Sequence, residues 1–442
     1  MKDRLFEIWF SLRCGVGNRE FQALLDTCGS PYEIYKADEN ELESMPCSQA
    51  LKSRLANKSL DEASRIMEYC KENRIGLLFW QDEGYPASLR PLRDPPILLY
   101  YRGRLPDLSA RLCISVVGTR SMSEYGKRIA YKIGYELGAA GAVVVSGMAL
   151  GNDGVAAAGA ILAGGSTVAV LGCGIDVVYP REHGRLLEEI TARGAIMTEF
   201  APGTPPEGKN FPIRNRIISG LSQGTVVVEG DLRSGALITA RTAILQGRDI
   251  YAFPGNVGET NSAGTNKLLS DGAVMVLRAR DLLENYTFLY NDTLDMTKLT
   301  RAETHSDPDE QGLERLGVCV RTEKPKAELP PPPTASYRDR RREAPADSHR
   351  GYASPATPKA EAPKASPAPA SVPARGDASD RALKSLTDTQ RRIFEALPLD
   401  HAVAIDYFTR EGFSVGEIMA TMTVLEIKGL TVTLPGGLYS RK

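Results

Sequence analysis

The stretch Leu112-Cys113-Ile114-Ser115-Val116-Val117-Gly118-Thr119-Arg120 decides the fold, because a short apolar run ends in a turn of glycine and polar residues. The run is rich in β-branched residues and predicts a buried strand, and a helical pattern follows over residues 124–140. The same order returns at once, since a strand predicted over 142–145 leads through 146–154 into another helix. Such repetition predicts an α/β fold with a parallel sheet.

Further strands and helices of this kind continue toward residue 277. The additional predicted strands are 167–171, 195–199, 225–229, 249–253 and 273–277, and the helices between them include 181–193, 212–222 and 235–246. This pattern is typical of a Rossmann-like doubly wound sheet, which binds its ligand at the carboxyl edge of the strands. Glycine lets backbone N–H groups approach an anion closely, so we expect the turns at that edge to hold phosphates.

Two zones flank this α/β domain, which we place at residues 81–295. Residues 1–80 predict a small helical domain of the helix-hairpin-helix or SAM-like type, for which DNA contact and a packing or partner role both stay open. Residues 296–384 predict a disordered linker rich in proline and alanine, because twelve of the 28 prolines lie between Pro325 and Pro373. A segment of this composition buries too little apolar surface to offset its ordering entropy.

The last zone, residues 385–442, predicts a winged helix. Three helical segments are followed by a hairpin over residues 430–440. The helix expected to read DNA, residues 415–428, is poor in the Arg, Asn, Gln and Lys side chains that contact base edges. This favours a protein-contact role over sequence-specific DNA binding.

Composition excludes several classes of protein. A formal net charge of −1 argues against coating nucleic acid by bulk charge, although a local cluster of cations can still bind it. The seven cysteines are scattered without a C-x-x-C pair and there are only four histidines, which indicates neither a zinc site nor a disulfide framework and favours a reducing cytoplasm. The apolar run 155–171 is interrupted at Gly164-Gly165-Ser166, so we expect no membrane span, and no signal peptide is predicted.

The richest candidate segment for binding is Lys209-Asn210-Phe211-Pro212-Ile213-Arg214-Asn215-Arg216, which opens a predicted helix. Its cations can clamp phosphates, the helix start offers free N–H groups, and Phe211 can stack on an unpaired base. In the alternative, Phe211 lies in the core and the arginines pair with Glu199 or Glu229. Arg120 lies in the first turn, at the same predicted edge.

No catalytic constellation stands out in the sequence. The chain has no G-x-x-x-x-G-K-[ST] loop, and nothing marks a nucleophile near His183, the histidine of the α/β domain. We therefore expect no catalytic residues, no metal and no cofactor.

Six segments, in this order, resemble the DNA processing protein A family, also called DprA or Smf. They are Ser115-Val116-Val117-Gly118-Thr119-Arg120 with Tyr125-Gly126, Ser146-Gly147-Met148-Ala149-Leu150-Gly151-Asn152-Asp153, Leu171-Gly172-Cys173-Gly174-Ile175-Asp176-Val177-Val178-Tyr179-Pro180, Phe211-Pro212-Ile213-Arg214-Asn215-Arg216-Ile217-Ile218-Ser219, Glu229-Gly230-Asp231-Leu232-Arg233-Ser234-Gly235, and Phe253-Pro254-Gly255-Asn256. The resemblance covers roughly residues 1–290 and the terminal winged helix.

The resemblance implies a non-catalytic, cytoplasmic protein of natural transformation. It would bind and protect incoming single-stranded DNA without sequence preference, self-associate as a homodimer and load the RecA recombinase onto the strand. The residues that the motif match assigns to single-stranded DNA are Arg120, Lys209, Phe211, Arg214, Asn215 and Ser234, with Gly118, Gly147 and Gly235 shaping the phosphate loops.

A rival from another class is a Rossmann-like nucleoside-monophosphate phosphoribohydrolase. Such enzymes carry a P-G-G-x-G-T-x-x-E motif, whereas Pro254-Gly255-Asn256 continues differently here. Release of free base from a nucleoside monophosphate would separate the two.

Overall fold

The computed structural model describes residues 2–318, residues 386–398 and scattered positions between 403 and 441. Contacts divide the chain into two units, residues 1–334 and 335–442. The disorder predicted for the proline-rich stretch lies outside the described residues, as does most of the predicted helix 415–428. Within the described residues, no helix combines the length and apolar character needed to cross a membrane.

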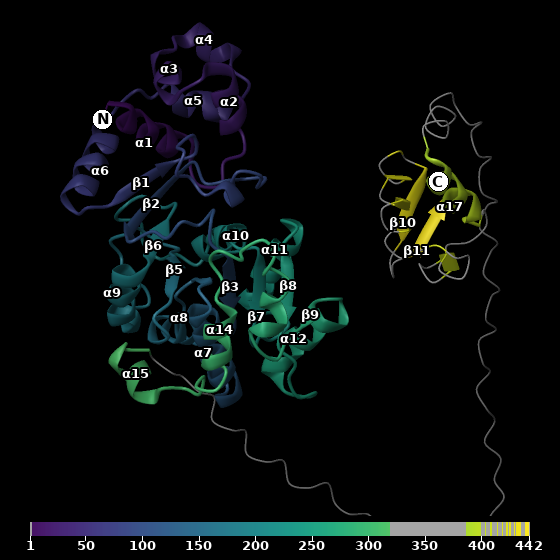
Figure 1. Ribbon diagram of the computed structural model, residues 1–442. Coiled ribbons are helices and arrows are strands. Elements are labelled where there is room, and N and C mark those ends of the chain that lie inside the picture. Colours follow the sequence, from purple (N-terminus) through teal and green to yellow (C-terminus); the bar gives the residue numbers. More distant parts are fainter. Residues whose placement is uncertain are drawn as a thin grey trace, which may run out of the picture. The chain divides into compact units, whose positions relative to one another are not determined.

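A nine-stranded sheet forms the centre of the first unit (Figure 1). Its strand order is β1-β2-β6-β5-β4-β3-β7-β8-β9, and the strands from β6 to β9 in this order are parallel to one another. These seven strands are the ones that the sequence predicts. Their bounds are β3 Cys113–Val117, β4 Val143–Ser146, β5 Ser166–Val170, β6 Ala195–Thr198, β7 Gly224–Val227, β8 Asp249–Ala252 and β9 Val274–Met275. The predicted Rossmann-like doubly wound sheet is confirmed.

Helices cover both faces of this sheet. On one face lie α7 (Glu124–Ala139), α8 (Asn152–Leu162) and α9 (Gly184–Arg193), and on the other lie α10 (Asn210–Leu221), α11 (Gly235–Leu245) and α12 (Thr260–Ser270). Within β4, Val144 belongs to the first core, and Val143 and Val145 belong to the second. Burial on both faces explains why the strands have continuous rather than alternating apolar sequence.

Two strands that the sequence analysis did not predict extend the sheet. Strand β2 (Leu98–Gly103) pairs antiparallel with β6, and β1 (Gly76–Phe79) pairs antiparallel with β2. The pairing of Tyr100 with Thr198 joins segments almost a hundred residues apart, so local sequence carries little sign of it. Because β1 belongs to the sheet, the α/β domain begins before the predicted boundary at residue 81.

Six helices form the N-terminal domain, as predicted for residues 1–80. They are α1 (Lys2–Cys14), α2 (Phe21–Cys28), α3 (Pro31–Lys36), α4 (Glu39–Ser44), α5 (Gln49–Leu55) and α6 (Asp61–Glu72). The loop between α1 and α2 faces the sheet domain, because the Gly17 N–H donates to the Glu199 carboxylate at 3.3 Å. That amide is thus engaged inside the protein and is not presented to a DNA phosphate.

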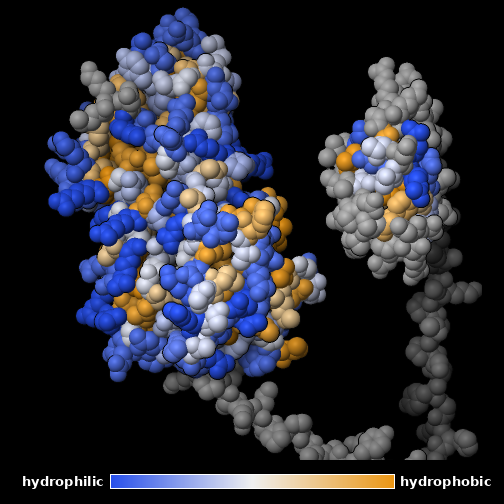
Figure 2. Space-filling model, in the orientation of Figure 1, coloured by the Kyte–Doolittle hydropathy of each residue, from blue (hydrophilic) through white to orange (hydrophobic). Residues whose placement is uncertain are grey.

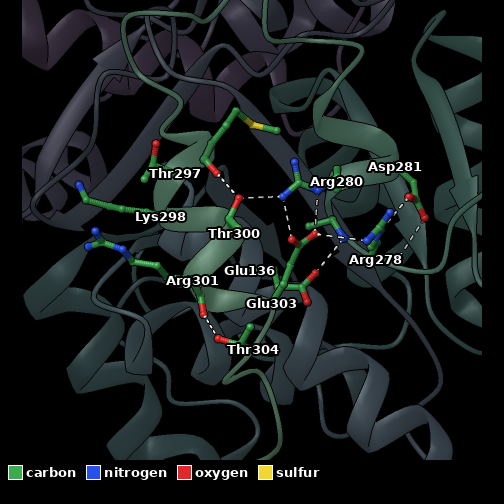
Figure 3. Close-up of polar contacts among 12 residues, drawn as sticks. Glu136, Arg278, Arg280, Asp281, Thr297, Lys298, Thr300, Arg301, Glu303 and Thr304 are labelled. Carbon is green, nitrogen blue, oxygen red and sulfur yellow. Dashed lines mark hydrogen bonds and ion pairs between the residues drawn. The ribbon is translucent and has the colours of Figure 1, made fainter.

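The predicted linker start at residue 296 is wrong. Helices α14 (Met296–Ala302) and α15 (Glu310–Arg315) continue the first unit. Arg280 donates to both oxygens of Glu303, at 3.0 and 2.7 Å, and to Thr300 of α14 (Figure 3). The fully buried Glu136 of α7 accepts hydrogen bonds from the Ala279 amide and from Ser306. These polar contacts anchor a segment whose sequence has little apolar periodicity.

The described part of the second unit agrees with a winged helix. Helix α17 (Asp388–Ala396) begins with a capping box in which the Thr387 and Gln390 side chains each accept from the other's backbone N–H. Strands β10 (Thr431–Leu434) and β11 (Leu438–Arg441) form the predicted hairpin. Ile393, Phe408 and Leu425 belong to a small core of their own.

Candidate nucleic-acid interface

The strand order of the sheet reverses between β3 and β7. From β3 the chain proceeds through β4, β5 and β6 toward one edge, and from β7 through β8 and β9 toward the other. In a doubly wound sheet, ligands bind beyond the carboxyl ends of the strands at such a point. A groove with a cavity volume of about 590 Å³ lies here, and we call it the switch-point groove. Its lining comes from residues 117–121 after β3, from Ala149 and Asp153, from Tyr179, and from the starts of α10 and α11.

Phe211, in the first turn of α10, is the aromatic centre of the switch-point groove. It is half-buried, and its ring lies 5.3 Å from that of Tyr179 at an interplanar angle of 36°. The guanidinium carbons of Arg120 and Arg214 lie 5.4 and 5.9 Å from its centroid, within the range of cation–π attraction. The alternative that places Phe211 in the core is therefore wrong.

The two arginines beside Phe211 differ in exposure. Arg120 is exposed and forms no ion pair within the described part of the chain. Arg214 is only 4% exposed, and its guanidinium donates to the Val170 carbonyl at the end of β5. Burial lowers the pKa of Arg214 to about 10, although the nearby Asp153 carboxylate opposes this change. Arg120 is thus the solvent-exposed cation of the groove, and Arg214 is its buried cation.

The glycines in the turns after β3 and β4 have other hydrogen-bond partners than the sequence predicts. We expected the N–H groups of Gly118 and Gly147 to face a bound phosphate, but both donate to the buried carboxylate of Asp153, at 3.3 and 3.0 Å. Glycine is needed at these positions for space. A Cβ on Gly147 would lie 2.3 Å from the Arg214 guanidinium, and one on Gly118 would lie 2.4 Å from the Asn152 side chain.

Other acidic residues near the groove have structural partners. Glu199 and Arg216, both buried, form an ion pair of 2.6 Å, so the alternative in which an arginine pairs with Glu199 is correct for Arg216. Glu229 accepts from the backbone N–H and the hydroxyl of Ser123, the N-cap residue of α7. Both carboxylates are therefore engaged in contacts within the protein.

The remaining predicted residues separate into two groups. Asn215, Ser234 and Gly235 line the switch-point groove with Arg120, Phe211 and Arg214. The Ser234 hydroxyl is buried without a hydrogen-bond partner among the described residues and does not cap α11, so the start of that helix is open toward the groove. Lys209 lies outside the lining; its side chain is 76% exposed and pairs with Glu207 at 2.6 Å.

Among the groove residues that the sequence analysis left without a role, an aromatic and an acidic one matter most for the chemistry of the groove. Tyr179 and Asp153 lie in the quoted motifs, but we assigned them no role. An acidic residue directly after a glycine turn, at the start of a helix, was the available signal for Asp153, because negative charge is favoured there.

A doubly wound sheet with arginines and an aromatic ring at its switch point defines a Rossmann-like protein whose groove combines positive charge with an aromatic surface. The family model described as DNA recombination-mediator protein A matches residues 76–287, and the DprA winged helix domain matches residues 377–437. The chain belongs to the DNA processing protein A (DprA/Smf) family.

Individual relatives agree with this assignment. DNA processing protein DprA of Bacillus subtilis is 38% identical over 220 residues, which cover 50% of this chain and 74% of that protein. Protein Smf of Escherichia coli is 38% identical over 242 residues, and the alignment spans 52% of this chain and 64% of the relative. The crystal structure of DNA processing protein A from Streptococcus pneumoniae superposes with a TM-score of 0.56 at 31% identity, covering 63% of this chain and 97% of that one.

Proposed function

We propose that this protein binds single-stranded DNA in the switch-point groove, without base-sequence preference and without breaking a bond. Arg120 and Arg214 attract the phosphates, the open start of α11 adds its N–H groups, and Phe211 offers a ring to an unpaired base. Membership of a DNA-processing family supports nucleic acid as the polyanion.

One observation carries this proposal: Phe211 is half-buried between Tyr179 and the exposed Arg120. A half-exposed ring with a cation beside it can stack on an unpaired base while the cation binds the phosphate of the same nucleotide. In a duplex the bases are stacked on one another and their faces are covered, so this arrangement favours single strands.

A binding series with a fluorescent oligo-dT strand and a duplex of equal length tests the proposal. The logarithm of the single-strand affinity should fall linearly with the logarithm of salt concentration, with a slope of about −0.7 for each phosphate neutralised. Two phosphate contacts would then cost roughly sevenfold for a fourfold rise in salt. Tighter duplex binding, or release of free base from a nucleoside monophosphate, would contradict the proposal.

We further propose that the protein acts as a homodimer that delivers bound strands to the RecA recombinase. An exposed apolar surface supports self-association: Leu245 at the end of α11 is 88% exposed, and Ile244 and Met275 are 54% and 57% exposed. Met275 belongs to β9, the edge strand of the sheet. Figure 2 shows hydrophobic surface along the flank that carries α11 and β9 in Figure 1.

Replacing Leu245 by Asp should shift the protein toward monomer, because a buried, unpaired charge in an apolar interface is costly. Analytical ultracentrifugation over a concentration series measures the shift. Val257→Asp, at a 98% exposed loop position after β8, is the matched control and should leave the mass unchanged. A wild-type protein that is monomeric at every concentration would refute the dimer.

A further inference from the structure

The N–H groups that a phosphate would be expected to use are already occupied. The carboxylate of Asp153 is 6% exposed and takes one hydrogen bond from the turn after β3, through Gly118, and one from the turn after β4, through Gly147. Both turns lie at the carboxyl edge of the sheet, where phosphates bind in related folds. A carboxylate with two amide donors makes the same kind of contact as two oxygens of a phosphate.

The same carboxylate balances the buried cation beside it. Arg214 lies against Gly147, and its Nε is buried without a hydrogen-bond partner among the described residues. No direct ion pair joins Arg214 to Asp153, but the negative charge of Asp153 favours the protonated guanidinium. Burial raises the pKa of the Asp153 carboxyl, whereas the charge of Arg214 and the amides of Gly147 and Gly118 oppose this rise and favour the carboxylate. A buried arginine without any nearby negative charge would carry a large desolvation cost.

We infer that Asp153 is a built-in anion that fills the phosphate cradle of this fold, holds Arg214 under Phe211, and closes the cradle to the phosphate of a free nucleotide. The inference rests on the proposed function, in that the groove beside the cradle holds the DNA backbone. Asp153 is therefore a positioning residue, which acts on the strand through Arg214. The filled cradle also explains how a fold that commonly binds nucleotides can bind a DNA strand. The strand lies on Arg120 and Phe211, beside the cradle.

The test removes the carboxylate and supplies it again from solution. In Asp153→Ala the two amides and Arg214 should lose their anion, and the melting temperature should fall by roughly 5–10 °C. Formate, which has the size of the deleted group, and inorganic phosphate should each raise that temperature saturably. The rise in melting temperature of Asp153→Ala should exceed the rise that the same anion causes in wild type, with the ionic strength held constant by chloride.

Binding of the oligo-dT strand provides a readout that a purely structural role would not move. Asp153→Ala should bind about tenfold more weakly, and formate should return the affinity to within about threefold of wild type. Asp295→Ala is the matched control, because the Asp295 carboxylate also accepts from two backbone N–H groups, at the start of α14 outside the groove. It should show neither the loss of affinity nor the response to formate.

Asp153→Asn keeps the volume but not the charge, and it serves if the alanine variant does not fold. It should bind the strand more weakly and should not respond to formate, because the site remains filled. Wild-type affinity in Asp153→Asn, or an alanine variant that gains nothing from formate or phosphate, would overturn the inference. If wild type itself did not bind the strand, the proposed function would fail, while the thermal experiment would still decide whether Asp153 fills the cradle.

Discussion

Replacing Arg120 and Phe211 together by alanine should weaken binding of single-stranded DNA by at least about 70-fold. Stacking of a base on an aromatic ring is worth about 1–3 kcal/mol, and a charge-assisted hydrogen bond to a phosphate about 1.5–3 kcal/mol. The two side chains lie at the same point of the switch-point groove, with the Arg120 guanidinium 5.4 Å from the Phe211 ring centroid. Fluorescence anisotropy with labelled oligo-dT measures the change.

The fold should survive this double change. Arg120 is exposed and Phe211 is half-buried, so the melting temperature should remain close to that of wild type. Arg301→Ala removes an exposed arginine of α14 outside the groove and serves as the control for net charge. The two single variants complete a double-mutant cycle, in which contacting residues are expected to be non-additive. Unchanged affinity in the folded double variant would exclude the groove as the binding site.

Replacing Glu199 by Gln should lower the free energy of unfolding by about 3 kcal/mol, because the buried Arg216 loses its partner. The two side chains are 3% and 6% exposed and their charged atoms lie 2.6 Å apart. Asp94, 3.8 Å from Arg216, compensates in part and keeps the loss near the low end of the range for broken buried pairs. Urea unfolding followed by circular dichroism gives the value.

The same change should also weaken DNA binding, because Arg216 lies on α10 with Phe211 and Arg214. Glu199 also accepts the Gly17 N–H, a hydrogen bond that the amide oxygen of Gln can still accept, so the expected effect comes from the loss of the charge that pairs with Arg216. The matched control is Glu189→Gln, which breaks an exposed pair with Arg193 and should cost at most about 1 kcal/mol. A Glu199 variant as stable as this control would show that the buried pair contributes nothing.

Strands β3, β4, β5 and β7 were predictable because each is a short run rich in β-branched residues with a glycine within three residues of its end. In a sheet covered on both faces, burial makes such runs continuous and therefore visible in local sequence. The antiparallel strands β1 and β2 were not predictable in this way, because their place depends on pairing with the distant β6. Helices α14 and α15 were mistaken for linker, since polar contacts such as that of Arg280 with Glu303 anchor them.

Most of the site residues predicted from the motif match line the switch-point groove, because the carboxyl ends of parallel strands meet at one edge. The roles of these residues were not. Arg214 and Arg216 are two positions apart on one helix and therefore point in nearly opposite directions. The helix rotation, which is set by packing against the sheet, places Arg214 beside Phe211 and Arg216 against Glu199.

Local patterns of apolar residues and glycines thus suffice to predict the doubly wound sheet and the edge at which the switch-point groove lies. Only the folded molecule shows that the carboxylate of Asp153 accepts the amides of Gly118 and Gly147, that Lys209 lies outside the groove, and that Arg216 pairs with Glu199, which also accepts an N–H from the N-terminal domain. The physical reason is that hydrogen bonds and ion pairs are directional and short in range, so side chains from distant segments must first be brought together before their partners are decided.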